Sequence, residues 1–127
     1  MKSIEAETNE KIQIIDITGD VESAQALDNG CIVLHTPHTT AALVINENES
    51  NLKTDLKKFY SALARGDWEH NRIDNNAGAH LVSTTLNSSL VIPVRDNKLV
   101  LGTWQSILLV ELDGPRRRKV NLMEMKS

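Results

Sequence analysis

The chain is poor in aromatic residues, cysteine and long apolar runs, and each shortage excludes a class of protein. Phe59, Tyr60, Trp68 and Trp104 are its only aromatic residues, which argues against a stacking platform for single-stranded nucleic acid. Cys31 is the only cysteine, so we expect a buried, inert thiol in a reducing compartment. No apolar run approaches the roughly 20 residues that span a bilayer, and the first residues form no signal segment. We therefore expect a cytoplasmic protein with no membrane partner.

The net charge and the length of the chain restrict its expected partners and its fold. The formal net charge is −3, opposite to that of a dedicated nucleic-acid-binding protein, so we expect no nucleic-acid partner. The 127 residues make one domain, 1–127, about half the length of a (β/α)₈ barrel. With 40% apolar and 24% charged residues, the composition is that of an ordinary globular chain.

Helical periodicity is clearest over 51–65, where apolar side chains recur on one helix face. Ser50 is the expected N-cap of this helix, and Gly66 its end. An earlier short helix is expected to start at Asp20 and to stop at Gly30.

The remaining apolar segments predict strands, because they are rich in β-branched and aliphatic residues. They span 12–17, 31–35, 39–46, 90–94, 99–101, 103–112 and 118–125. Short turns separate the last four segments, which predicts consecutive antiparallel hairpins. With a further short helix over 79–86, the predicted fold class is α+β: a single compact domain of mostly antiparallel sheets with a few helices.

A polar segment, 67–78, contains few apolar residues, and such loops inside compact domains are usually functional or disordered. His70 and the nearby His80 offer imidazole nitrogens to a divalent metal, magnesium or zinc. Asp67 or Asp74 is then a carboxylate ligand or an orienting group. The alternative is a solvated loop whose histidines only hydrogen-bond to the backbone.

A second candidate group stands at the start of the strand 39–46. A histidine followed by hydroxyls, as in His38, Thr39 and Thr40, suits a site that holds a phosphate or moves a proton. Glu47 closes this strand about 30 Å from the histidine at 3.3 Å per residue. The two share a site only if the strand bends sharply or if a neighbouring subunit brings them together.

Further polar residues lie in the last third of the chain. Trp104 could form the wall of a pocket, and Gln105 could hydrogen-bond to a ligand there. Trp104 is equally suited to packing in a core. Arg116 and Arg118 share one strand face and suit a phosphate clamp. The alternative is a charged strand edge that prevents aggregation.

Several short motifs follow one another along nearly the whole chain. They are His38-Thr39-Thr40-Ala41-Ala42-Leu43, Ile45-Asn46-Glu47, His70, Asn76 before Ala79-His80-Leu81, Ile92-Pro93-Val94, Leu101-Gly102-Thr103-Trp104-Gln105 and Glu111-Leu112-Asp113-Gly114-Pro115-Arg116. This order resembles the YjbQ family, the secondary thiamine-phosphate synthase group. One departure is Asn87-Ser88-Ser89, where the family pattern has a glycine.

The resemblance implies a sandwich-like or jelly-roll-like homotrimer with a histidine site at a subunit boundary. It also implies a transferase of low activity, which joins a hydroxymethylpyrimidine pyrophosphate to a thiazole phosphate as a main or a secondary activity. In that chemistry Arg116 and Arg118 would stabilise the leaving pyrophosphate, His38 would contact phosphate or move a proton, and His70 and His80 with an aspartate would hold a metal.

Two other functions stay open. One is a metal-dependent hydrolase of a phosphorylated small molecule, with water as the nucleophile. The other is a non-catalytic trimeric protein that binds a phosphorylated metabolite or a metal.

Overall fold

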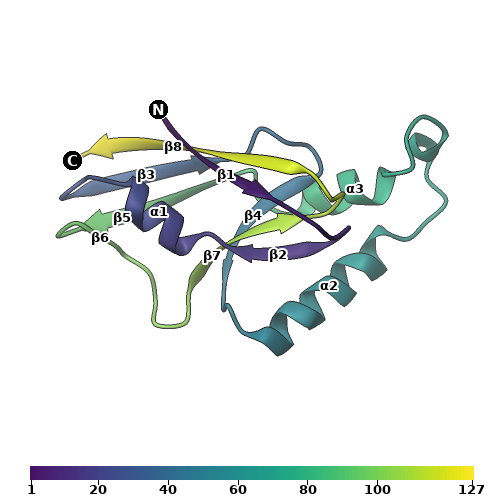
Figure 1. Cartoon of the computed structure of the whole chain (residues 1–127), viewed down its shortest axis with the longest axis horizontal. Coiled ribbons are helices and arrows are strands. Elements are labelled where there is room, and N and C mark those ends of the chain that lie inside the picture. The colour runs from purple at the N-terminus through teal and green to yellow at the C-terminus, as the bar shows by residue number, and fades with distance from the viewer.

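Eight strands form two antiparallel sheets, which three α-helices and one 3-10 helix connect or cover (Figure 1). In this computed structural model, which describes residues 1–127, the elements are β1 (Lys2–Glu7), β2 (Gln13–Asp16), α1 (Thr18–Ala24), β3 (Gly30–His35), β4 (Ala41–Asn46), α2 (Ser50–Ala64), η1 (Glu69–Arg72), α3 (Ala77–Thr85), β5 (Ser89–Arg95), β6 (Lys98–Leu99), β7 (Ser106–Glu111) and β8 (Arg117–Lys126). The large sheet has the order β1-β8-β3-β5-β6, and the small sheet has the order β2-β7-β4.

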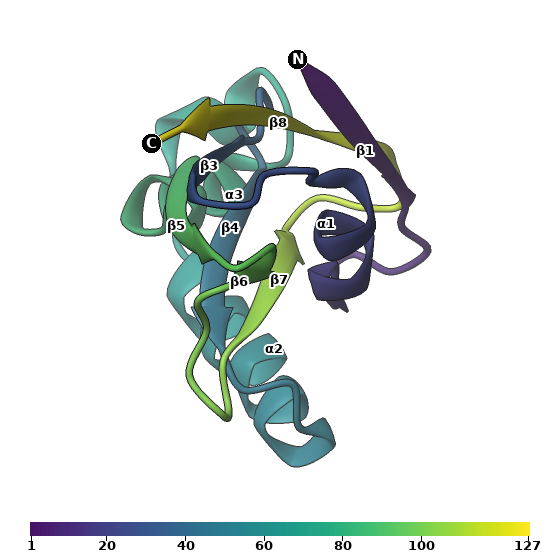
Figure 2. The ribbon, with the colours of Figure 1, turned by 90° about the vertical axis from the view of Figure 1, so that its left-hand side faces the viewer.

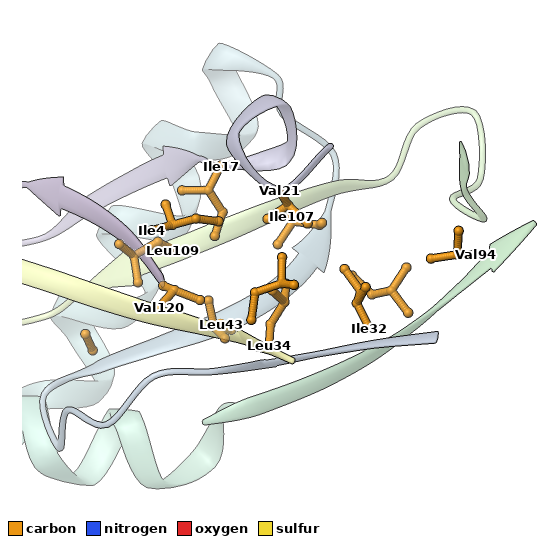
Figure 3. Packing of buried hydrophobic residues seen from close by; sticks show 13 residues of the cluster. Ile4, Ile17, Val21, Ile32, Leu34, Leu43, Val94, Ile107, Leu109 and Val120 are labelled. Atoms are coloured by element: carbon orange, nitrogen blue, oxygen red, sulfur yellow. The ribbon is translucent and has the colours of Figure 1, made fainter. Parts of the chain in front are cut away.

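The main core lies between the two sheets (Figure 3). Along β3, Ile32 and Leu34 are fully buried, because alternate side chains of a strand point to the same face. Ile107 and Leu109 of β7 join the same cluster from the small sheet, and Val21 of α1 joins it from the side. Each such buried aliphatic side chain contributes about 1.5–3 kcal/mol.

The small sheet is buried on both of its faces. Leu108 and Val110 of β7 point away from the main core and pack with Tyr60 of α2 and Val82 of α3. The layers are therefore the large sheet, the small sheet and a layer formed by α2 and α3 (Figure 2). The predicted fold class, a single α+β domain of antiparallel sheets, is confirmed. None of the helices has the length and apolar character needed to cross a membrane.

The expected series of C-terminal hairpins is only partly confirmed. β5 and β6 form a hairpin around Asp96 and Asn97, whose φ angles of 51° and 63° suit a tight hairpin turn. By contrast, β7 and β8 lie in different sheets, so the segment 112–116 is a crossover between them. The prediction was wrong there because β7 is apolar on both faces and fits only a sheet that is covered on both sides.

The N-terminal third also differs from the sequence prediction. β1 pairs with β8, and Ile4 is its only buried residue, so its sequence carries too weak an alternation to indicate a strand. α1 begins at Thr18, which puts Asp20 in its first turn rather than at its N-cap. Gly30 opens β3 instead of ending the helix.

The two later helices lie close to their predicted ranges, with a different cap. Glu49, not Ser50, is the N-cap of α2: its carboxylate accepts hydrogen bonds from the N–H groups of Asn51 and Leu52 at 2.6 and 2.9 Å. These two bonds hold the pKa of Glu49 below its ordinary value. α3 begins at Ala77, slightly earlier than the predicted range.

The outer face of the large sheet carries uncovered apolar side chains, which we call the apolar face. Register places them in two cross-strand rows on β5, β3 and β8. They are Cys31, Val33, Val91, Pro93, Met123 and Met125. Cys31, expected to be buried, is only half-buried there.

Candidate functional site

A hollow of about 390 Å³, here named the polar hollow, collects residues from four separate segments. These segments are the approach to β4, the residues before α3, α3 itself and the start of β8. The lining residues are Pro37, His38, Thr39, Thr40, Asp74, Asn76, His80, Arg116 and Arg118. Apart from the proline all of them are polar, and most are residues that the sequence analysis selected.

Arg118 lies at the base of the polar hollow in a buried ion pair. Its Nε and Nη2 donate hydrogen bonds to the two carboxylate oxygens of Glu111. Nη2 also donates to the backbone oxygen and the hydroxyl of Thr40, at 3.1 and 2.9 Å. These bonds leave Nη1 without a partner in the chain. The arrangement fixes the guanidinium and keeps one nitrogen free to donate to a ligand.

Glu111 is fully buried and ionised. Burial raises the pKa of its carboxyl group, but hydrogen bonds from Arg118, the Asp113 N–H and Thr8 outweigh that effect, so the pKa lies below its ordinary value. The Thr8 hydroxyl donates at 2.7 Å. The alternative interpretation of the arginines as a charged sheet edge does not fit Arg118, which is 3% exposed and paired with the buried Glu111.

His38 is held as a neutral imidazole. Its Nε2 accepts a hydrogen bond from the backbone N–H of Lys119 at 2.9 Å, so this nitrogen carries no proton. Burial lowers the pKa of the imidazole below 6.5, and the positive charges of Arg118 and Arg116 lower it further, against an opposing effect of Glu111. Nδ1 then carries the proton, and the ring offers one N–H donor beside two arginines.

Asp113 fixes two lining residues of the polar hollow from outside it. Its Oδ2 accepts hydrogen bonds from Arg116 Nη2 at 3.0 Å and from Asn76 Nδ2 at 2.9 Å, and its Oδ1 pairs with Lys11 Nζ at 2.6 Å. Burial raises the pKa of Asp113, but the hydrogen bonds from Lys11, Asn76 and Arg116 prevail and lower it to about 2.

Neither Glu111 nor Asp113 was predicted as a site residue from the sequence. Both lie at the end of an apolar strand, which hides their role. The available signal was a pair of carboxylates two residues apart, just before the arginine run. Carboxylates so placed suit the task of holding guanidinium groups.

His70 and His80 lie together at one side of the polar hollow. Their ring centroids are 4.7 Å apart and the rings meet edge to face. His80 lines the hollow, whereas Nε2 of His70 and Oδ1 of Asn76 are buried without a hydrogen-bond partner. Such buried unpaired polar atoms are rare and costly, which makes them candidates for contact with water or a ligand.

The predicted metal ligands do not form a complete set within one chain. No group of three or more histidine, cysteine, aspartate or glutamate side chains is arranged to hold a metal ion. His70 and His80 supply two donors, and Asp67, exposed after α2, does not line the hollow. Protein zinc sites generally use three or four protein ligands.

Three further predicted site residues also lie outside the polar hollow. Trp104 is 73% exposed between β6 and β7, so it neither packs in a core nor forms a wall of the hollow. Gln105 beside it hydrogen-bonds within its own turn. Glu47 follows the far end of β4, as the 3.3 Å rise per residue predicted.

Comparison with protein families and sequences gives one consistent result. A family model described as "UPF0047 protein YjbQ-like" matches residues 2–127. The chain is 48% identical over 116 residues to a UPF0047 protein of Archaeoglobus fulgidus, covering 89% of this chain and 91% of that protein. It is 34% identical over 125 residues to the UPF0047 protein YugU of Bacillus subtilis, covering 93% of each.

Solved structures agree with the sequence relatives. The hypothetical protein APE1520 from Aeropyrum pernix K1 has a TM-score of 0.95 and 45% identity, over 99% of this chain and 98% of that one. A YjbQ/UPF0047 family protein from Clostridium acetobutylicum has a TM-score of 0.91 and 34% identity, over 98% of this chain and 100% of that one.

Proposed function

Since the chain belongs to the YjbQ-like UPF0047 family, we propose that it is a transferase with thiamine-phosphate synthase activity, as a main or a secondary activity. The proposal places the phosphate or pyrophosphate group of a small metabolite in the polar hollow. One observation carries it: Arg118 is buried and held by Glu111, yet it keeps Nη1 unpaired at a hollow that Arg116 also lines. A fixed guanidinium with a free donor suits a phosphate oxygen.

The proposed reaction requires these residues to stabilise the negative charge of the leaving pyrophosphate. The nitrogen of the thiazole phosphate forms a bond to the methylene carbon of the pyrimidine. The bond from that carbon to the pyrophosphate oxygen breaks, and pyrophosphate leaves with the electron pair. Arg118 and Arg116 would stabilise the negative charge that develops on it. The neutral His38, protonated on Nδ1, would donate a hydrogen bond to a phosphate oxygen.

Metal binding is a separate hypothesis, and the proposed reaction assigns no step to a metal. Of the predicted ligands, His70 and His80 have their rings in contact, and Asp74 lines the polar hollow together with His80. If they do bind a divalent ion, the protein variant His80→Ala should lose most of it in elemental analysis, and unchanged metal content would contradict this assignment.

A phosphohydrolase is the second candidate function, and the buried, unpaired Nε2 of His70 beside His80 favours it, because such an atom is suited to hold a water molecule. Water would then replace the thiazole nitrogen as the nucleophile. Transfer releases thiamine phosphate, hydrolysis releases inorganic phosphate, and a non-catalytic binding protein releases neither.

The deciding experiment measures thiamine phosphate formed by the purified protein with magnesium and both substrates. His38→Ala and His70→Ala are the test variants. His35→Ala is the matched control, because His35 lies exposed at the end of β3, outside the hollow, and hydrogen-bonds to Ser89 Oγ at 2.9 Å. We expect product from the wild type and from the control, and a large loss in the two test variants. Absence of product from the wild type would contradict the transferase, and product that survives both mutations would contradict the assignment of the site to His38 and His70.

We also propose that the protein is a cytoplasmic homotrimer. The apolar face supports assembly, because it exposes contiguous side chains such as Val91, Met123 and Met125, which are 64%, 46% and 51% exposed. Assembly would also allow Trp104, Gln105 and Glu47 to approach the polar hollow of a neighbouring subunit. The lone cysteine supports the cytoplasm, since no disulfide calls for an oxidising compartment.

A further inference from the structure

The groove between α2 and the turn that joins β1 to β2 concentrates positive charge. It encloses about 440 Å³ and is lined by Glu10, Lys11, Ile12, Lys57, Lys58, Ser61 and Arg65. Four cationic side chains and one carboxylate therefore meet here, in a chain whose net charge is −3. We call this feature the basic groove.

Neutralisation within the protein accounts for only part of this charge. Lys57 pairs with Glu10 at 2.7 Å, and Lys11 pairs with Asp113 at 2.6 Å. The side chains of the remaining two cations, Lys58 and Arg65, make neither an ion pair nor a hydrogen bond within the chain. Their charges are therefore available to a ligand.

Helical spacing places the free donors together. Lys58 and Ser61, three residues apart, lie on one side of α2, and Arg65 follows four residues later at the C-cap of this helix; all three line the groove. The Ser61 hydroxyl is half-buried and makes no hydrogen bond to protein. Nothing in the fold uses these groups.

We propose that the basic groove is a second anion-binding site, which takes the phosphate group of a small phosphorylated molecule. Guanidinium, ammonium and hydroxyl donors together match the oxygens of a phosphate. The groove and the polar hollow share no lining residue, so the two sites are separable by mutation. This inference goes beyond the proposed transferase activity and does not depend on it.

The test titrates inorganic pyrophosphate into the protein in a calorimeter, at about 150 mM salt to suppress weak surface binding. The groove variant is Lys58→Gln/Arg65→Gln. The matched control is Lys53→Gln/Lys126→Gln, which removes the same charge outside the groove. Arg116→Gln weakens the polar hollow alone, because Arg116 lines only that site.

We expect the wild type and the control to bind two pyrophosphates per chain. In the groove variant one of these sites should weaken by at least about tenfold, and this site should persist in Arg116→Gln. Binding by the groove variant equal to that of the control would overturn the inference. So would a single wild-type site that Arg116→Gln removes, or no binding at all. Binding that survives Arg116→Gln and fails only in the groove variant would support the groove and count against phosphate binding in the hollow.

Discussion

At the residue scale, the candidate site depends on two carboxylates that lie outside the polar hollow and accept hydrogen bonds from its arginines. Glu111 is fully buried against Arg118, which is 3% exposed. Asp113 holds Arg116 and Asn76 at the rim of the hollow. A buried ion pair adds little net stability over an apolar pair of similar volume, but it fixes the direction of a guanidinium. We infer that these carboxylates preorganise the arginines for an anion.

Removal of Glu111 alone should destabilise the fold far more than replacement of both Glu111 and Arg118. Glu111→Leu leaves the buried guanidinium of Arg118 uncompensated and should lower the free energy of unfolding by roughly 3–5 kcal/mol. The double variant Glu111→Leu/Arg118→Met should lose less than this single variant. Urea denaturation followed by circular dichroism measures both. A double variant less stable than the single one would contradict the uncompensated charge as the cause.

Asp113 should make stability depend on pH in a narrow acidic range. Its carboxyl pKa is about 2 in the folded chain against an ordinary 3.8. A lowered pKa stabilises the fold fully above the ordinary value, and this contribution disappears as pH falls through about 2. At about 1.4 kcal/mol per pH unit, the contribution is roughly 2 kcal/mol.

The variant Asp113→Asn should therefore lose stability less steeply between pH 4 and pH 2 than the wild type does. Urea denaturation at a series of pH values gives the comparison. Asp55→Asn is the control, because Asp55 is exposed on α2 and makes no ion pair. If the free energy of unfolding falls equally steeply with pH in the wild type and in Asp113→Asn, Asp113 does not cause the acid dependence.

At the scale of the elements, β3 lies in the middle of the large sheet, and its first residue is constrained by β8. Gly30 has φ of +145°, and a Cβ atom there would lie 2.1 Å from the backbone oxygen of Met125. Only glycine combines this φ with so close an approach of two strands. Gly19 in α1 is the opposite case, since a Cβ atom there meets nothing within 4 Å.

The two glycines therefore predict opposite effects of the same substitution. Gly30→Ala should lower the free energy of unfolding by more than about 2 kcal/mol, because backbone must move to accommodate it. Gly19→Ala should raise it by up to about 1 kcal/mol, through helix propensity alone. Thermal denaturation of the two variants beside the wild type measures the difference. Equal stability of the two variants would contradict the close contact of β3 with β8.

At the scale of the whole molecule, α1 packs at the side of the main core, and α2 and α3 form a layer on the small sheet. α2 and α3 bury the second face of the small sheet, whereas the apolar face of the large sheet has no cover within the chain. Contiguous exposed apolar side chains on a sheet commonly mark an interface. The proposed homotrimer would cover this face.

Charge on the apolar face should therefore dissociate the assembly. Light scattering should report a trimer for the wild type and a folded monomer for Val91→Glu/Met123→Glu, since burial of two carboxylates in an apolar contact is costly. Ile73→Glu/Val100→Glu is the control, because these residues are 79% and 43% exposed outside the apolar face. A wild-type monomer, or a trimer that tolerates the face variant, would contradict the proposal.

The sequence by itself determined the types of the longer elements and most of the polar hollow. Helical period indicated α2, and segments rich in β-branched and aliphatic residues indicated β3, β5 and most of β8. Polar residues beside apolar segments indicated His38, His80, Arg116 and Arg118. These predictions succeeded because period and polarity are local properties: a residue shows them through its neighbours along the chain.

Only the tertiary structure decided which strands pair and which polar residues meet. It separated β7 from β8, paired the weakly patterned β1, and selected Glu111 and Asp113 as anchors of the arginines. It also placed Trp104 outside the hollow. Pairing and burial depend on which second surface covers a segment. That surface comes from residues far away along the chain, so no local pattern encodes it.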